Sequence, residues 1–112
     1  MPPRSLSGAD QPARHERPVI DEAALLAARH ADRLLAEARA IGRTRWATYL
    51  EAMPDRLRDA QVHELRSVGL RARAAYGPKD SIRDALPPDL TEPFLRSIDR
   101  LLKALARAEM ED

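Results

Sequence analysis

The sequence contains no cysteine, which excludes disulfide bonds, thiolate catalysis and the common structural zinc sites. It also has no apolar run of the length that crosses a bilayer. Residues 1–18 lack the apolar stretch of a secretory signal. These absences are typical of a protein of the reducing cytoplasm, so we expect a cytoplasmic location and no membrane partner.

Charge of one predominant sign is absent as well. The chain has 19 Lys and Arg residues against 18 Asp and Glu, a net charge of +1, so no overall field recruits nucleic acid or an anionic membrane. The charges are nevertheless unevenly distributed. Residues 43–73 contain seven arginines and four acidic residues, whereas residues 74–112 contain six basic and eight acidic residues. Binding of phosphate groups is therefore expected, if anywhere, in residues 43–73.

Large apolar side chains are scarce. Hydrophobic residues make up 44 % of the 112 residues, but about 20 of them are alanine. Because burial energy scales with apolar area, at roughly 25 cal/mol per Å², the predicted core is thin. A thin core favours self-association as a further way of covering apolar surface. We therefore expect a homodimer.

The strongest positive signal is helical periodicity. In residues 91–110, large apolar side chains recur at steps of four and three residues, which places them on one face of a helix. Residues 21–41 repeat this spacing with alanine, and Gly42 follows where a glycine commonly ends a helix. No segment alternates with a period of two residues, so no strand is expected.

Three further helices are predicted between these two. A short helix over residues 44–53 contains Trp46, the only tryptophan, which we expect to anchor the core. A long helix covers residues 54–76, and one or two helical turns fall within residues 77–88. The predicted fold class is therefore all-α: a small antiparallel helical bundle of three long and two short helices. The side chains predicted to be interior are Leu34, Ile41, Trp46, Leu50, Leu65, Phe94, Ile98, Leu101 and Leu105.

The N-terminal segment differs from the rest in composition. Residues 1–18 hold four of the nine prolines and almost no apolar residue other than Leu6. Such a segment buries too little surface to offset the entropy lost on ordering. We predict a disordered N-terminal tail over residues 1–18 and a single helical domain over residues 19–112.

Motifs that carry chemistry are lacking. No G-x-S-x-G sequence occurs. Asp59 and His63 stand four residues apart on a predicted helix, but two ligands do not make a metal site. Residues 77–81 contain the glycine and lysine of a phosphate loop, yet the end of one helix and the start of the next explain them. We predict no catalytic residue, no metal ion and no cofactor, and hence no enzyme.

Arginines of the predicted third helix are the remaining functional signal. Arg66 and Arg73 are seven residues apart and share a face, Arg71 lies on another side, and Tyr76 is an apolar neighbour. We predict a non-enzymatic helical protein–protein interaction module, a regulatory or assembly partner, that contacts its partner through these four residues. The alternative is a nucleic-acid-associated regulator that binds phosphates with the same arginines. The positive and negative segments could also pair with each other, within one chain or across a dimer.

Overall fold

The computed structural model describes residues 13–111, so residues 1–12 of the disordered tail expected over residues 1–18 lie outside the described residues. Every regular element in the described range is helical, which confirms the all-α class. None of the described helices is both long enough and apolar enough to cross a membrane. The elements are η1 (Arg14–Glu16), α2 (Pro18–Ala40), α3 (Thr44–Leu50), α4 (Met53–Asp59), α5 (Val62–Ala74), α6 (Ile82–Ala85) and α7 (Pro88–Glu111).

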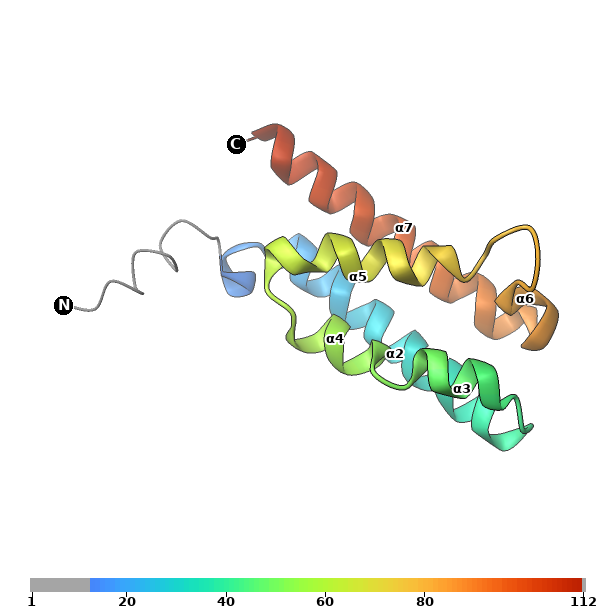
Figure 1. The fold of residues 1–112 in the computed structure, drawn as a ribbon. Helices are drawn as coiled ribbons and strands as arrows, with labels where there is room; N and C mark the ends of the chain where they lie inside the picture. The colour runs from blue at the N-terminus through green and yellow to red at the C-terminus, as the bar shows by residue number, and fades with distance from the viewer. Residues whose placement is uncertain (1–12, 112) are drawn as a thin grey trace.

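Successive helices run in alternating directions (Figure 1). The chain runs out along α2, returns along α3 and α4, runs out again along α5 and returns along α7. This order is consistent with the predicted antiparallel bundle. Helix α2 packs against α7, α3 and α4, and α5 packs against α7 and α4. Helix α2 is therefore the element that most of the others cover.

The alanine spacing of α2 explains this central position. Six of its nine buried residues are alanine, so neighbouring helices can approach it closely on two sides. The larger side chains that close over it include Phe94, Ile98 and Leu101 of α7, none of which has measurable exposure. Eight of the nine side chains predicted to be interior are buried. Periodicity alone thus identified interior positions on both of the long helices α2 and α7.

Ile41 is the exception, and its predicted burial is wrong, since its side chain is 47 % exposed. Helix α2 ends one residue earlier, at Ala40. Gly42 then adopts a φ of +73°, and the Arg43 N–H donates to the Ala38 carbonyl over 2.8 Å. This glycine turn closes the helix as predicted, but it carries Ile41 off the buried face.

The predicted single helix over residues 54–76 is also wrong, because the chain breaks it in two. Ala60 and Gln61 adopt extended conformations, with ψ angles of 144° and 160°. The Gln61 N–H donates to Glu64 Oε1 over 3.0 Å, a contact that satisfies an otherwise unpaired donor at the start of α5. Residues 44–59 accordingly form two short helices, α3 and α4, rather than one helix and the beginning of a longer one.

Arg14 ties the segment before α2 to this break. Its Nη1 donates to the carbonyls of Leu57, Arg58 and Ala60 over 2.9, 2.6 and 3.1 Å. Its Nε donates to Asp21 Oδ1 over 2.8 Å, and the side chain is 11 % exposed. The carbonyls at the end of a helix lack partners within it, and here one guanidinium supplies them. Residues 13–18 therefore belong to the folded structure, contrary to the expected boundary.

Candidate anion-binding groove

Two of the predicted contact residues hold helices together. Arg66 Nη1 of α5 lies 3.8 Å from Glu109 Oε1 of α7. Arg73 of α5 forms an ion pair with Asp99 of α7. Both pairs join the same two helices, so these arginines pair internally and present little unpaired charge to a partner. The sequence analysis considered that the positive segment, residues 43–73, pairs with the negative segment, residues 74–112, within one chain. These two ion pairs join the two segments in that way.

Arg71 and Tyr76 point in other directions. The Arg71 guanidinium lies 5.0 Å from the ring centroid of Tyr49, whose hydroxyl donates to the Arg71 carbonyl. The Tyr76 hydroxyl donates to the carbonyl of Thr91, and burial raises the pKa of this hydroxyl. The structure therefore does not gather the four predicted residues on one surface. Arg66 and Arg73 face α7, Arg71 faces Tyr49 of α3, and Tyr76 faces Thr91 near the start of α7.

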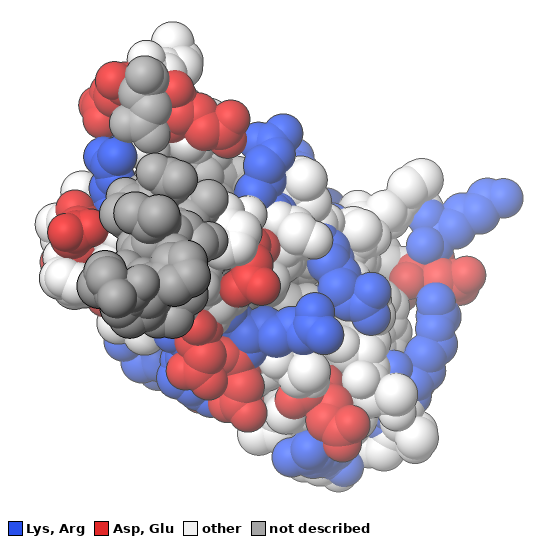
Figure 2. Space-filling model, turned by 60° about the vertical axis from the view of Figure 1, so that its left-hand side comes forward, with Lys and Arg blue, Asp and Glu red and all other residues white. Residues whose placement is uncertain are grey.

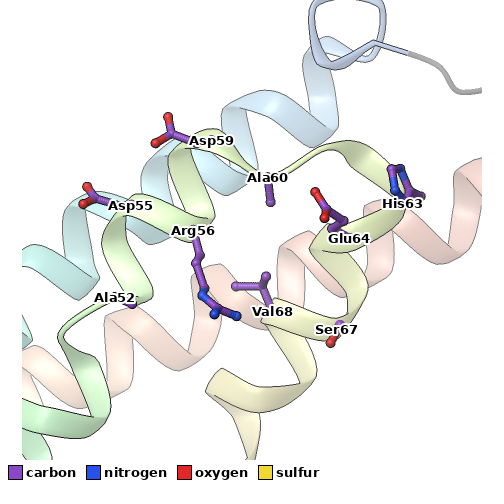
Figure 3. A pocket seen from close by; sticks show the side chains of 9 residues that line it. All are labelled: Ala52, Asp55, Arg56, Asp59, Ala60, His63, Glu64, Ser67 and Val68. Atoms are coloured by element: carbon purple, nitrogen blue, oxygen red, sulfur yellow. The ribbon is translucent and has the colours of Figure 1, made fainter. Parts of the chain in front are cut away.

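A polar hollow of about 710 Å³ lies between α4 and α5 (Figure 3). Arg56 reaches into it, whereas the carboxylates of Asp55 and Asp59 turn away toward solvent. Glu64 is engaged by the Gln61 N–H. Asp59 and His63 line the same hollow from different helices, and residues 13–111 contain no group of three or more side chains able to hold a metal. The hollow thus brings no pair of carboxylates together.

A longer depression follows the line where α2 and α7 pack. It consists of three adjoining hollows of about 320, 500 and 350 Å³. The first and second share Arg100, and the second and third share Val19, Ala104 and Arg107. We call this depression the seam groove. Its apolar lining residues are Pro18, Val19, Ile20, Ala23, Leu25, Leu26, Ala104 and Ala108.

Five cationic side chains of α2 and α7 line the seam groove, and a sixth, Arg33 of α2, lies one helical turn beyond Arg29. Two come from α2, one helical turn apart, and four come from α7 at steps of four, three and four residues, which places them on one face. All six are exposed, and no ion pair joins any of them to an acidic residue within residues 13–111. We call them the seam cations: Arg29, Arg33, Arg96, Arg100, Lys103 and Arg107.

His30 reports the electrostatic field of this cluster. Its imidazole is partly buried between α2 and α7, and that burial is the main cause that lowers its pKa below the ordinary histidine value. The positive charges of Arg33, Arg29 and Arg96 lower the pKa further, and these arginines come from both helices. Every charge that shifts this histidine is positive. The two sets of cations therefore act on one region of the surface.

Acidic side chains stand at the margins. Glu22 lines the first hollow, and Glu16 and Glu111 line the third, at the end nearest Pro18. Asp99 lines the second hollow but is already paired with Arg73. The positive part of the groove thus has a limited length, centred on Arg100.

The sequence contained a signal for this groove that was not used. The four α7 cations share a face, but a charged stripe on a helix is usually a solvated surface. Whether such charges are paired depends on which acidic residues lie across from them, and that is a property of the packed helices. For the same reason, the sequence did not reveal that Arg66 and Arg73 of α5 pair with acidic residues of α7.

Comparison of the chain with protein-family models, with curated proteins and with solved structures finds no match. No relative therefore supplies a function by similarity. The seam groove has to be interpreted from its own residues.

Proposed function

We propose that the chain is a non-enzymatic protein–protein interaction module of the cytoplasm, a regulatory or assembly partner that docks another protein in the seam groove. The observation that supports this most directly is the set of seam cations without acidic partners. Elsewhere in residues 13–111, Arg14, Arg58, Arg66, Arg73 and Arg83 are paired with carboxylates. Other arginines without an ion pair, such as Arg39, Arg43 and Arg56, do not line this groove. Unpaired like charges repel one another, and an anionic partner would relieve that repulsion.

The apolar lining of the groove favours a protein as the partner. Protein interfaces commonly have an apolar centre and a polar rim, and arginine is enriched in them. Val19, which is 61 % exposed, lies in the groove beside Arg100 and Arg107. Apolar surface of this kind contributes to binding a polypeptide but little to binding phosphates.

Nucleic acid is the second candidate, because the same cations could contact phosphates. Single-stranded nucleic acid is commonly bound by stacking bases on aromatic rings. All four aromatic residues lie elsewhere: Trp46 and Phe94 are buried, and Tyr49 and Tyr76 pack beneath arginines of α5 and α6. On the face shown in Figure 2, acidic and basic side chains are also interspersed, so a long polyanion would meet repulsive charges. These features rank nucleic acid second.

A charge-reversal variant tests the proposal. Changing Arg96, Arg100 and Arg107 to Glu, the seam variant, reverses the charge of the groove at exposed positions. We expect the wild-type chain to capture a protein from a nuclease-treated lysate of its source, and the seam variant to lose that protein. Capture that disappears with nuclease treatment would instead support the second candidate.

A matched control makes this result specific. Changing Arg39, Arg43 and Arg56 to Glu alters net charge by the same amount at exposed positions outside the groove. This control variant should retain the captured protein. Equal capture by all three chains would exclude the seam groove as the docking site. Circular dichroism of each variant establishes that it is folded.

We also propose that two copies associate through the side where α5 meets α7. Leu70 and Met110 are 47 % and 87 % exposed. Leu70 lies one turn after Arg66, and Met110 directly follows Glu109, so apolar and oppositely charged groups occur together. In a dimer with two-fold symmetry, Arg66 of each copy could pair with Glu109 of the other copy. Sedimentation equilibrium should show a dimer that Leu70→Glu dissociates, and a wild-type monomer at high concentration would contradict this.

A further inference from the structure

From the spacing of charges along the groove, we infer the form of its occupant: an acidic amphipathic α-helix, whose apolar stripe lies on the groove lining and whose carboxylates face the seam cations. This inference rests on the proposed function and specifies the partner of the same site. Three features of the groove support it: the spacing of the α7 cations, the presence of cations on both rims, and the shallow apolar lining.

The spacing of the four α7 cations along the helix axis matches the spacing of side chains on one face of a second helix. Arg96, Arg100, Lys103 and Arg107 are separated by rises of roughly 6, 4.5 and 6 Å, about 16 Å in all. A helix laid alongside α7 would present carboxylates at positions i, i+4, i+7 and i+11 with the same spacing. An extended peptide advances about 6.6 Å for every second residue, so over the same three intervals it would fall out of step by about 3 Å.

Cations occur on both rims of the groove. Arg29 borders it from α2 and lines the same hollow as Arg100 of α7, and Arg33 lies one helical turn further along α2. An occupant that fills the groove should therefore carry acidic residues on both sides of its apolar stripe. Five of the six seam cations are arginines, which bind carboxylates through two parallel hydrogen bonds.

The lining suits the apolar face of a helix. Ala23, Ala104 and Ala108 are small, so a helix can approach the seam closely, and Val19 and Leu26 offer larger apolar contacts. The lining residues of α2 extend from Pro18 to Arg29, roughly 16 Å of helix. An occupant of three to four turns would cover it, which is the usual range for a helix bound in a groove.

Three fluorescently labelled peptides of identical length, roughly 18 residues, test this inference by anisotropy at physiological salt. The first is a helix-forming peptide of Ala, Leu and Glu, with Glu at i, i+4, i+7 and i+11 beside a Leu stripe. The second has the same composition, with Glu distributed around the helix. The third is the first peptide with a central Ala replaced by Pro. A 20-base-pair DNA duplex is measured in parallel.

We expect the first peptide to bind at least about tenfold more tightly than the second and the third, since only it aligns charges and apolar side chains together. Arg100→Ala, at the position shared by two hollows, should weaken that binding about tenfold. Arg39→Ala, which alters an exposed arginine outside the groove, should leave it unchanged.

The remaining outcomes separate this inference from the proposed function. Equal binding of the three peptides would show that the groove recognises only negative charge, and would overturn the helical occupant while leaving a protein-docking role intact. Absence of peptide binding would overturn the helical occupant as well. Binding of the duplex alone, weakening steeply with salt, would overturn both and support nucleic acid. Capture by the wild-type chain but not by the seam variant tests the docking role independently.

Discussion

The two sides of α7 use the same residue types in opposite ways. On the side facing α5, Arg66 and Arg73 meet Glu109 and Asp99, and the four charges join two helices. On the side facing α2, the seam cations form no ion pair with an acidic residue within residues 13–111. An arginine on the first side is part of the scaffold, whereas one on the second remains available to another molecule. Substitutions that distinguish these roles test the comparison directly.

The largest effect is expected in the shared interior of α7, which supports both sides. Phe94 is fully buried, and Phe94→Ala should lower the free energy of unfolding by about 3–5 kcal/mol, because the lost apolar contacts leave a cavity. Urea denaturation followed by circular dichroism measures this change. Ile41→Ala, at a position 47 % exposed, is the control and should change stability little. Wild-type stability of Phe94→Ala would mean that α7 does not form the core.

Arg14 provides the next largest contrast, as an arginine whose Nε and Nη1 both donate hydrogen bonds within the fold. Arg14→Ala removes the donor from three backbone carbonyls and should lower the free energy of unfolding by about 1–3 kcal/mol. Arg100→Ala removes a side chain without such partners and should leave stability nearly unchanged. Thermal melting of the two variants compares them. Equal destabilisation would contradict the division between scaffold and available arginines.

Removing a single charge should change stability less, and in opposite directions on the α5 side and the α2 side of α7. A double-mutant cycle between Arg73 and Asp99 should show a favourable coupling of about 0.2–1 kcal/mol, as for other exposed ion pairs. Arg100→Gln should instead raise the melting temperature slightly at low salt, because it relieves repulsion among the seam cations, and this gain should disappear at high salt. A loss of stability in Arg100→Gln would show that this residue has an internal partner.

The fold was predictable wherever one periodic pattern determined the answer. The alanine spacing of α2 and the Phe94–Leu105 stripe of α7 identified the central pair of helices and interior positions on both. The break at Gln61 was missed because the residues before and after it also favour helix, and only the capping position of Glu64 marks it. The ordering of Arg14 depends on carbonyls more than forty residues away, which no local pattern reveals.

The candidate site was less predictable for a similar reason. Sequence reasoning also selected arginine as the residue type of interest, but it chose Arg66, Arg71 and Arg73 from a local excess of positive charge. Whether that charge is available depends on contacts between helices that are distant in sequence, such as Arg73 with Asp99. The seam groove draws its cations from α2 and α7, whose exposed faces become neighbours only after packing.

The smallest effect concerns His30, whose pKa is lowered by burial and by Arg33, Arg29 and Arg96. Between this lowered pKa and the ordinary histidine value, the unfolded chain binds more protons than the folded one, so stability should fall as the pH decreases through that range. His30→Gln should remove this part of the pH dependence, measured by urea denaturation at several pH values. A partner in the seam groove adds negative charge beside the arginines, so it should raise the pKa of His30. Titration of the His30 ring protons by NMR, with and without the acidic peptide, would show this shift. An unchanged pKa in the bound state would place the peptide away from the α2–α7 seam, and with it the distinction between the two sides of α7 would lose its functional meaning.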